Sequence, residues 1–240
     1  VVVLNVAAGA GVAAYGVVKW NYFQTSPKAS SEGWFGRTTK SGGADKLGHV
    51  WTTYAASHLL ADIYNDWGYS EARANTMGAL SALGIQTMME LGDSFSEDFG
   101  FSYEDMIMNA AGAGAAYILG RYPYLKSKID LRVEYEPDSA SDFAGDIFSD
   151  YEKQNYLLVL KLDGFEMFEE SYLGYLELHM GYFTRGYEVY REGHPDGRRR
   201  SMFFGVGFNV TRLIKKFAKF SLFNYVQLPY VSTQYDVSLE

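Results

Sequence analysis

Acidic and histidine side chains recur at helical spacing in the first half of this 240-residue chain. Asp45 and His49 are four residues apart, so they would lie on one face of a helix. Glu90 and Asp93 come near the end of a second helical segment, and Asp105 comes near the start of a third. Carboxylates together with a histidine can hold a divalent metal, and a His–carboxylate pair can act as a general base. The spacing therefore predicts a polar pocket where helix ends converge.

Two interpretations of this predicted pocket stay open. In the catalytic one, His49 is a general base paired with Asp45, and Glu90 and Asp105 bind a metal or water. The candidate ligands of a divalent metal are then His49, Asp45, Glu90 and Asp93. In the structural one, the same groups form a buried hydrogen-bonded network that fixes helix packing.

Two features favour the structural interpretation. Asp105 follows Ser102 in the S-x-x-D pattern of a capping box, which satisfies amides at a helix start. Asp45 also comes near a helix start, where the helix dipole favours an acid. Lys46 and Asn109 are further polar residues on the same segments, and we assign them, with Ser102, a structural role.

The elements that must position these residues are four predicted helices. They cover residues 1–18, 45–64, 70–92 and 102–119. The first contains a single polar side chain, Asn5, and is long enough either to span a bilayer or to lie buried in a bundle. Because the chain begins at Val1 rather than Met, we expect a signal peptide upstream.

The second half of the chain has sequence patterns that are typical of β-strands. Strand-like runs cover residues 129–136, 156–163, 172–187, 201–213 and 223–231. Two of them alternate, with large apolar side chains on one face and Gly or polar side chains on the other, as in outer-membrane barrels. Five or six strands are too few for an ordinary barrel. We therefore expect a curved sheet packed on the helices, or strands that face lipid; a soluble sheet with one buried face fits equally.

These elements predict an α+β protein. A helical domain would span residues 1–125, and an antiparallel, aromatic-rich sheet or partial barrel would span 126–238. Within the latter, acids repeat every four residues and predict a short acidic helix over about 139–152. We interpret residues 239–240 as a remnant of cloning.

Composition excludes several function classes. The net charge of −8 argues against nucleic-acid binding, which needs a basic face. The absence of Cys excludes disulfides, zinc fingers and thiol catalysis. No G-x-S-x-G elbow or Gly-rich phosphate loop is present. Aromatic residues make up 17% of the chain, which is typical of a membrane interface or a β-rich surface.

A resemblance to a known family rests on residues 42–120. This segment contains D-K-L-G-H from Asp45, G-Y-S, E-L-G-D from Glu90, and F-S-Y-E-D ending at Asp105, in that order. It resembles the YfiM-type putative lipoproteins of bacteria, a family of unknown function. A more distant likeness is to VanZ-like membrane proteins. The resemblance implies an exported protein of the bacterial envelope, at the outer membrane or its periplasmic face, although the lipobox Cys is missing here.

Three functional hypotheses follow. The first is a noncatalytic protein associated with the outer membrane, with envelope lipid as its partner. The second is a metal-assisted hydrolase acting on a lipid or a cell-wall precursor. The third is a channel or transport accessory, which would need a homo-oligomer because one chain has too few strands for a pore.

Overall fold

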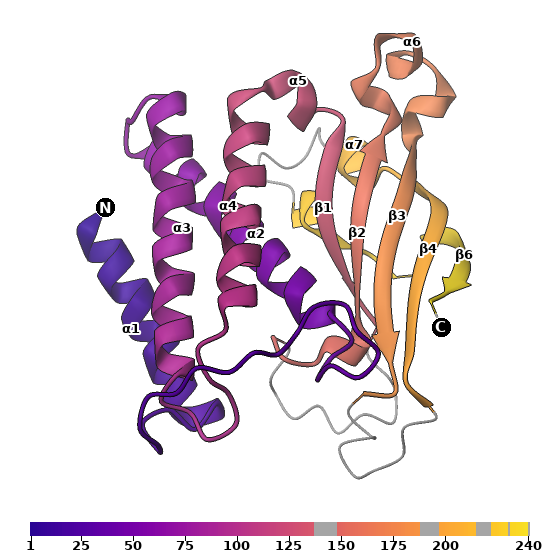
Figure 1. Cartoon of the computed structure of the whole chain (residues 1–240). Helices are drawn as coiled ribbons and strands as arrows, with labels where there is room; N and C mark the ends of the chain where they lie inside the picture. The colour runs from indigo at the N-terminus through magenta and orange to yellow at the C-terminus, as the bar shows by residue number, and fades with distance from the viewer. Residues whose placement is uncertain (137–147, 188–196, 215–221, 230, 240) are drawn as a thin grey trace. The chain divides into compact units, whose positions relative to one another are not determined.

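The computed structural model describes residues 1–136, 148–187, 197–214, 222–229 and 231–239 (Figure 1). The chain divides into two compact units, and the helix α2 (Ala44–Asp66) contributes to both. Unit 1 comprises Val1–Trp34 and Thr52–Arg121; unit 2 comprises Phe35–Trp51 and Tyr122–Glu240. Long helices in the first half and a six-stranded sheet in the second confirm the α+β class.

Unit 1 is built from four helices whose bounds differ from the predicted ones by only a few residues. Besides α2 they are α1 (Val2–Lys19), α3 (Glu71–Asp93) and α4 (Tyr103–Arg121). Small residues allow these helices to approach closely. A Cβ atom on Gly78 of α3 would lie 2.4 Å from the carbonyl oxygen of Ser57 on α2, so glycine is needed there.

The first helix is held to the bundle by the side chain of Asn5. Asn5 donates to Ser81 Oγ at 2.9 Å and accepts from the Tyr64 hydroxyl at 3.0 Å. Among the described helices, α1 alone is long and apolar enough to cross a membrane, although core helices and signal sequences share those properties. The hydrogen bonds explain how an apolar helix with a single Asn packs against α2 and α3.

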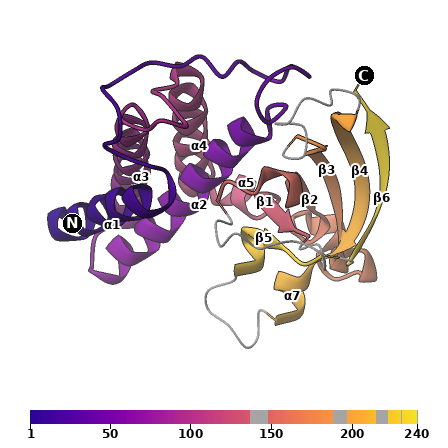
Figure 2. The ribbon, with the colours of Figure 1, turned by 90° about the horizontal axis from the view of Figure 1, so that it is seen from below.

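Unit 2 contains one curved sheet with strand order β5-β1-β2-β3-β4-β6 (Figure 2). The strands are β1 (Ile129–Tyr135), β2 (Gln154–Lys161), β3 (Leu176–Arg185), β4 (Arg199–Phe208), β5 (Val226–Gln227) and β6 (Ser232–Ser238). All neighbours pair antiparallel except β1 and β5, which are parallel. The short helix α5 (Pro123–Lys126) leads into β1, and the short helices α6 (Glu166–Glu169) and α7 (Val210–Ile214) lie in the connections between later strands.

The strand predictions are wrong at four places. Of the described residues in the run 223–231, only Val226–Gln227 is a strand, and Leu222–Asn224 is a 3-10 turn. The run 201–213 stops being a strand at Phe208, because Asn209 caps α7 by accepting the amide of Arg212 at 2.9 Å. The run 172–187 begins as a 3-10 turn, Tyr172–Tyr175, and the strand β6 was not predicted. The acidic helix expected over 139–152 lies largely outside the described residues; its described end forms a 3-10 turn, Tyr151–Lys153.

The two faces of the sheet have opposite character. Residues paired across the strands share a face, so the register assigns each side chain. The inner face carries the buried side chains Asp130, Arg132, Glu134, Leu157, Val159, Lys161, Glu177, His179, Phe183 and Phe203. The outer face carries the exposed apolar side chains Leu158, Leu178, Met180, Phe204, Val206, Phe208, Tyr235 and Val237.

Candidate functional sites

Two acids that the sequence singled out lie side by side in unit 1. Glu90, near the end of α3, and Asp105, in the first turn of α4, are 1% and 3% exposed. Their carboxylate oxygens lie within 4.8 Å of each other, and a carboxylate oxygen of Glu32 lies within 4.8 Å of Asp105. We call Glu32, Glu90, Glu104 and Asp105 the acid cluster.

Ser102 organises the acid cluster. Its hydroxyl accepts the amide of Asp105 at 3.2 Å, which is the first half of a capping box. Its backbone amide donates to Glu90 Oε2 at 3.3 Å. In a standard capping box this amide bonds to the acid three residues later, but here Glu90 of α3 accepts it. The hydroxyl also donates to Glu104 Oε2 at 3.2 Å. The cap of α4 thus ties three acids to one serine.

Neighbouring acids of the cluster differ in protonation. Burial, with the charges of Asp105 and Asp93 next in size, raises the pKa of Glu90 to about 9. Burial also acts to raise the pKa of Glu104, but hydrogen bonds from Ser31 (2.5 Å), Ser102 and the backbone outweigh it, and the net shift is downward. At neutral pH the cluster therefore holds a proton on Glu90 beside an ionised Glu104. Acid–base catalysis needs carboxyl groups whose pKa values differ in this way, and a structural hydrogen-bond network can use the same difference.

The other predicted residues occur in both units. In unit 1, Thr53 Oγ1 of α2 donates to Asn109 Oδ1 of α4 at 2.9 Å, and Asp93 raises the pKa of Tyr22 after burial, the larger cause. In unit 2, the first turns of α2 carry Asp45, Lys46 and His49. Lys46 Nζ contacts Asp45 Oδ2 at 2.6 Å, and both residues are buried. The catalytic and metal-binding roles given to these residues stay predictions.

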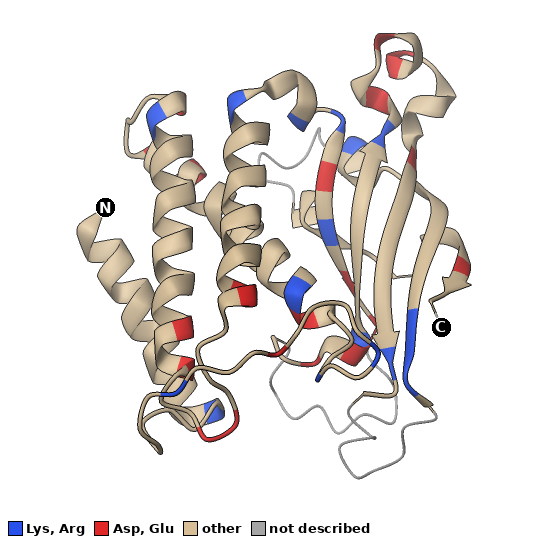
Figure 3. Cartoon of the chain, viewed as in Figure 1, with Lys and Arg blue, Asp and Glu red and all other residues tan. Residues whose placement is uncertain are grey.

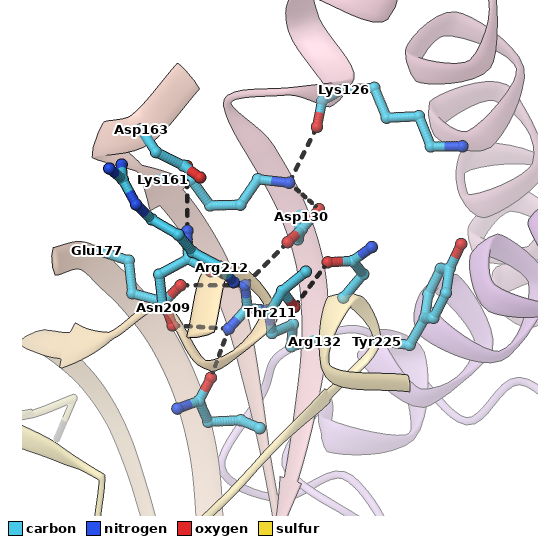
Figure 4. Close-up of polar contacts among 12 residues, drawn as sticks. Lys126, Asp130, Arg132, Lys161, Asp163, Glu177, Asn209, Thr211, Arg212 and Tyr225 are labelled. Carbon is cyan, nitrogen blue, oxygen red and sulfur yellow. Dashed lines mark hydrogen bonds and ion pairs between the residues drawn. The ribbon is translucent and has the colours of Figure 1, made fainter. Parts of the chain in front are cut away.

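The sequence analysis missed a second polar cluster, on the inner face of the sheet (Figure 4). Arg132 of β1 donates from Nη1 to Glu177 Oε1 at 2.6 Å and to Gln227 Oε1 at 2.8 Å. Its Nη2 donates to Asp130 Oδ2 at 2.9 Å and to Glu177 Oε2 at 3.1 Å. Lys161 Nζ donates to the other oxygen of Asp130 at 2.7 Å. We call these five residues and His179, which contacts Glu177 Oε1 at 3.0 Å, the inner-face network.

The charges of the inner-face network balance. Two cations, Arg132 and Lys161, face two carboxylates, Asp130 and Glu177, on side chains that are at most 10% exposed. Burial alone would lower the pKa of Arg132, but Asp130 and Glu177 outweigh it and the net shift is upward. The two carboxylates thus outweigh the cost of burying the charge of Arg132, as a buried ion network requires.

One sequence signal could have revealed this network. In IDLRVEY, charged residues occupy every second position at Asp130, Arg132 and Glu134, which places three charges on one face of a strand. Apolar side chains of Leu157, Val159, Phe183 and Phe203 fill the same face beside the charges. The inner face is thus packed with side chains, which argues against a pore through this unit.

The outer face is the third candidate, as an interaction surface. Its eight apolar side chains are between 39% and 74% exposed, over β2, β3, β4 and β6. Between Met202 and Phe208 the outward positions of β4 carry no charge, and Arg200 is the cation that follows on the same face at the end of the strand (Figure 3). Monomeric soluble proteins rarely expose a continuous apolar surface of this kind, so the outer face is a candidate surface for contact with lipid or protein.

Comparison with known proteins gives one family. Residues 31–121 match the model of a family described as predicted periplasmic lipoprotein (DUF2279). No curated protein and no solved structure gives a significant match. The match covers the acid cluster and α2 but not the sheet, and it leaves the YfiM-type and VanZ-like resemblances as predictions. It supports an exported protein of the cell envelope, similar over residues 31–121 to predicted periplasmic lipoproteins whose activity is not assigned.

Proposed function

We propose that this chain is a noncatalytic protein of the bacterial envelope that associates with the outer membrane by laying the outer face of its sheet against lipid. The observation that carries this proposal is the inverted pattern of the sheet: charges are buried on the inner face, and large apolar side chains are exposed on the outer face. In water the opposite arrangement is favoured, because exposing apolar area costs about 25 cal/mol per Å².

The dimensions and charges of the outer face fit a lipid contact. From Met202 to Phe208, β4 turns only Met202, Phe204, Val206 and Phe208 outward, and none is charged. Seven residues of a strand extend over roughly 20 Å, close to the apolar band of about 25 Å on outer-membrane barrels. Arg200 follows at the end of this stretch, where a cation meets anionic headgroups.

Flotation with vesicles tests the proposal. The purified chain is mixed with vesicles of phosphatidylethanolamine and phosphatidylglycerol, and its distribution in a density gradient is measured. We expect wild type to float and Phe204→Asp to bind vesicles about tenfold more weakly, because a charge on a lipid-facing strand is unfavourable and a carboxylate is also repelled by anionic phosphatidylglycerol. Phe204 is 50% exposed, so the variant keeps its fold in water.

Met167→Asp is the matched control. Met167 is 77% exposed on α6, away from the outer face, and its replacement leaves flotation unchanged. Equal flotation of Phe204→Asp and wild type would contradict a lipid contact through the sheet. A stable dimer without lipid, dissociated by Phe204→Asp, would assign the surface to a second copy of the chain instead.

The metal-assisted hydrolase is the second candidate, and the proximity of Glu90 and Asp105 favours it. Both acids are buried, and two carboxylates can hold a hard divalent cation together with further oxygen or nitrogen ligands. Asp93 is the proposed additional ligand within unit 1, and Asp45 and His49, named as ligands from the sequence alone, stay predictions. The raised pKa of Glu90 argues for a bound proton over a bound cation in the protein alone, so we rank this role second.

A further inference from the structure

An apolar cavity of about 220 Å³ lies within unit 2, between the first turns of α2 and the outer face of the sheet. Leu47, Val50 and Trp51 line it from α2, and Leu131, Leu158 and Met202 line it from β1, β2 and β4. The cavity is smaller than the roughly 300–1,000 Å³ of pockets that enclose a whole drug-sized molecule. It suits a segment of hydrocarbon chain.

The cavity is continuous with the exposed outer face. Leu158 and Met180 line the cavity and are also 40% and 41% exposed. A chain that enters between them passes from the surface into the cavity without crossing a polar barrier. An occupant reaching the cavity from the outer face must therefore be apolar along this part of its length.

A cation lies near one end of the cavity. Arg200 shares the outer face with Met202, two residues along β4, which is about 7 Å. Its guanidinium donates to two neutral acceptors, the carbonyl oxygens of Phe35 and Leu239, the latter at 3.0 Å. Within the part of the chain that the structure describes, no carboxylate pairs with Arg200, so its charge is available to an anion.

Tyr182 connects the cavity to this cation. It lines the cavity and donates its hydroxyl to the carbonyl oxygen of Gly42 at 2.5 Å. Burial is the main reason that its pKa is raised to about 12, and Arg200 acts in the opposite direction, as a nearby cation does. Apolar lining and an uncompensated positive charge therefore adjoin one another on a single surface.

We propose that the cavity binds one acyl chain of an anionic phospholipid, with the headgroup phosphate beside Arg200. The inference rests on the proposed lipid contact of the outer face and adds a specific site to it. The occupant combines an apolar chain, which the cavity lining selects, with a negative charge, which Arg200 selects. The lipid is held partly out of the bilayer, against α2.

Quenching of Trp51 tests this site. The purified chain is added to vesicles in which phosphatidylglycerol carries bromine on its acyl chains, because bromine quenches indole fluorescence only near contact. Trp51→Phe identifies the share of the emission that Trp51 contributes. We expect brominated lipid to quench most of the Trp51 emission in wild type, and unbrominated lipid to quench none of it.

Two valine variants make the test specific. Val50→Phe fills the cavity, and it should restore the emission of Trp51 while flotation stays as in wild type. Val206→Phe makes the same change on the exposed outer face, outside the cavity lining, and should leave the quenching in place. If Val50→Phe does not fold, as shown by its melting curve, Leu131→Phe fills the cavity from the opposite side.

The headgroup contact has its own comparison. Arg200→Gln should weaken the quenching by phosphatidylglycerol about fivefold, as expected for one basic residue at an anionic surface, and Arg200→Lys should retain most of it. Equal quenching by brominated phosphatidylcholine in wild type would overturn the anionic part of the proposal. Flotation of wild type without quenching of Trp51 would overturn the cavity site and leave the lipid contact standing, whereas failure to float would overturn both.

Discussion

Replacing Arg132 with methionine is expected to lower the free energy of unfolding by about 3–5 kcal/mol. The side chain of Arg132 is 1% exposed, and it makes four hydrogen bonds to Glu177, Asp130 and Gln227. Without it, Glu177 is left as an uncompensated charge in a buried site, and Asp130 keeps only Lys161. Urea denaturation of both proteins measures the difference.

Two comparisons decide whether the loss comes from the buried charge. Arg185→Met removes a cation whose side chain is 25% exposed and whose partner Glu136 is 36% exposed, so it should cost less, about 1–2 kcal/mol, chiefly for the hydrogen bond to Asn155 at 2.7 Å. Adding Glu177→Leu to Arg132→Met should recover part of the lost stability, because the orphaned carboxylate is gone. If Arg132→Met lowers the free energy of unfolding no more than Arg185→Met does, the inner-face network does not hold a buried, paired charge at Arg132.

Replacing Glu90 with glutamine is expected to stabilise the protein at neutral pH by about 2–3 kcal/mol. The folded-state pKa of about 9 exceeds the ordinary value of 4.5, so between these values the unfolded chain releases a proton that the folded chain retains. The stability that depends on this proton is fully present below about pH 4.5 and is lost as the pH rises to about 9. Glutamine does not ionise, and its carbonyl can still accept the amide of Ser102.

The pH dependence is the diagnostic feature of this prediction. The advantage of Glu90→Gln should be near zero at pH 4.5 and should grow by up to about 1.4 kcal/mol per pH unit above it. Thermal melts of both proteins between pH 4 and 9 measure it. Glu71→Gln, an exposed change near the start of the same helix, should stay within about 0.5 kcal/mol at every pH.

The metal content of the same preparations separates the two roles of the acid cluster. A bound divalent cation would keep Glu90 ionised, so Glu90→Gln would destabilise the protein and release the metal. His49→Ala should release it too if His49 is a ligand. Loss of stability and of a stoichiometric metal in Glu90→Gln would contradict the protonated Glu90 and advance the hydrolase.

The helices and the first strands could be predicted from local pattern. The bounds of the helices follow closely from the apolar periodicity, from the cap at Ser102, and from the small residues at Gly78 and along α4. The alternation in 176–182 and 202–208 assigned the faces of β3 and β4 correctly, since a strand turns successive side chains to opposite sides. The polar strand β6 was missed because its sequence, STQYDVS, has no apolar run and gains its place by pairing with β4.

The functional residues were harder to predict because they depend on contacts between distant segments. Glu90 supplies half of the cap of α4 from another helix, and no local pattern indicates that bond. Arg132 and Glu177 are 45 residues apart, and Gln227 is 95 residues from Arg132. The parallel pairing of β5 with β1, which brings Gln227 beside β1, cannot be inferred from either segment alone.

The most direct test of the lipid contact is a spin-label scan along β4. The chain contains no Cys, so single cysteines at the outward positions 202, 204, 206 and 208 can be labelled without removing a native thiol. On vesicles, we predict high accessibility to oxygen and low accessibility to a water-soluble nickel complex at these four positions, and high accessibility to the nickel complex at the exposed control position 167. High accessibility to the nickel complex at 204 and 206 on vesicles would mean that the outer face remains in water, and it would contradict the account.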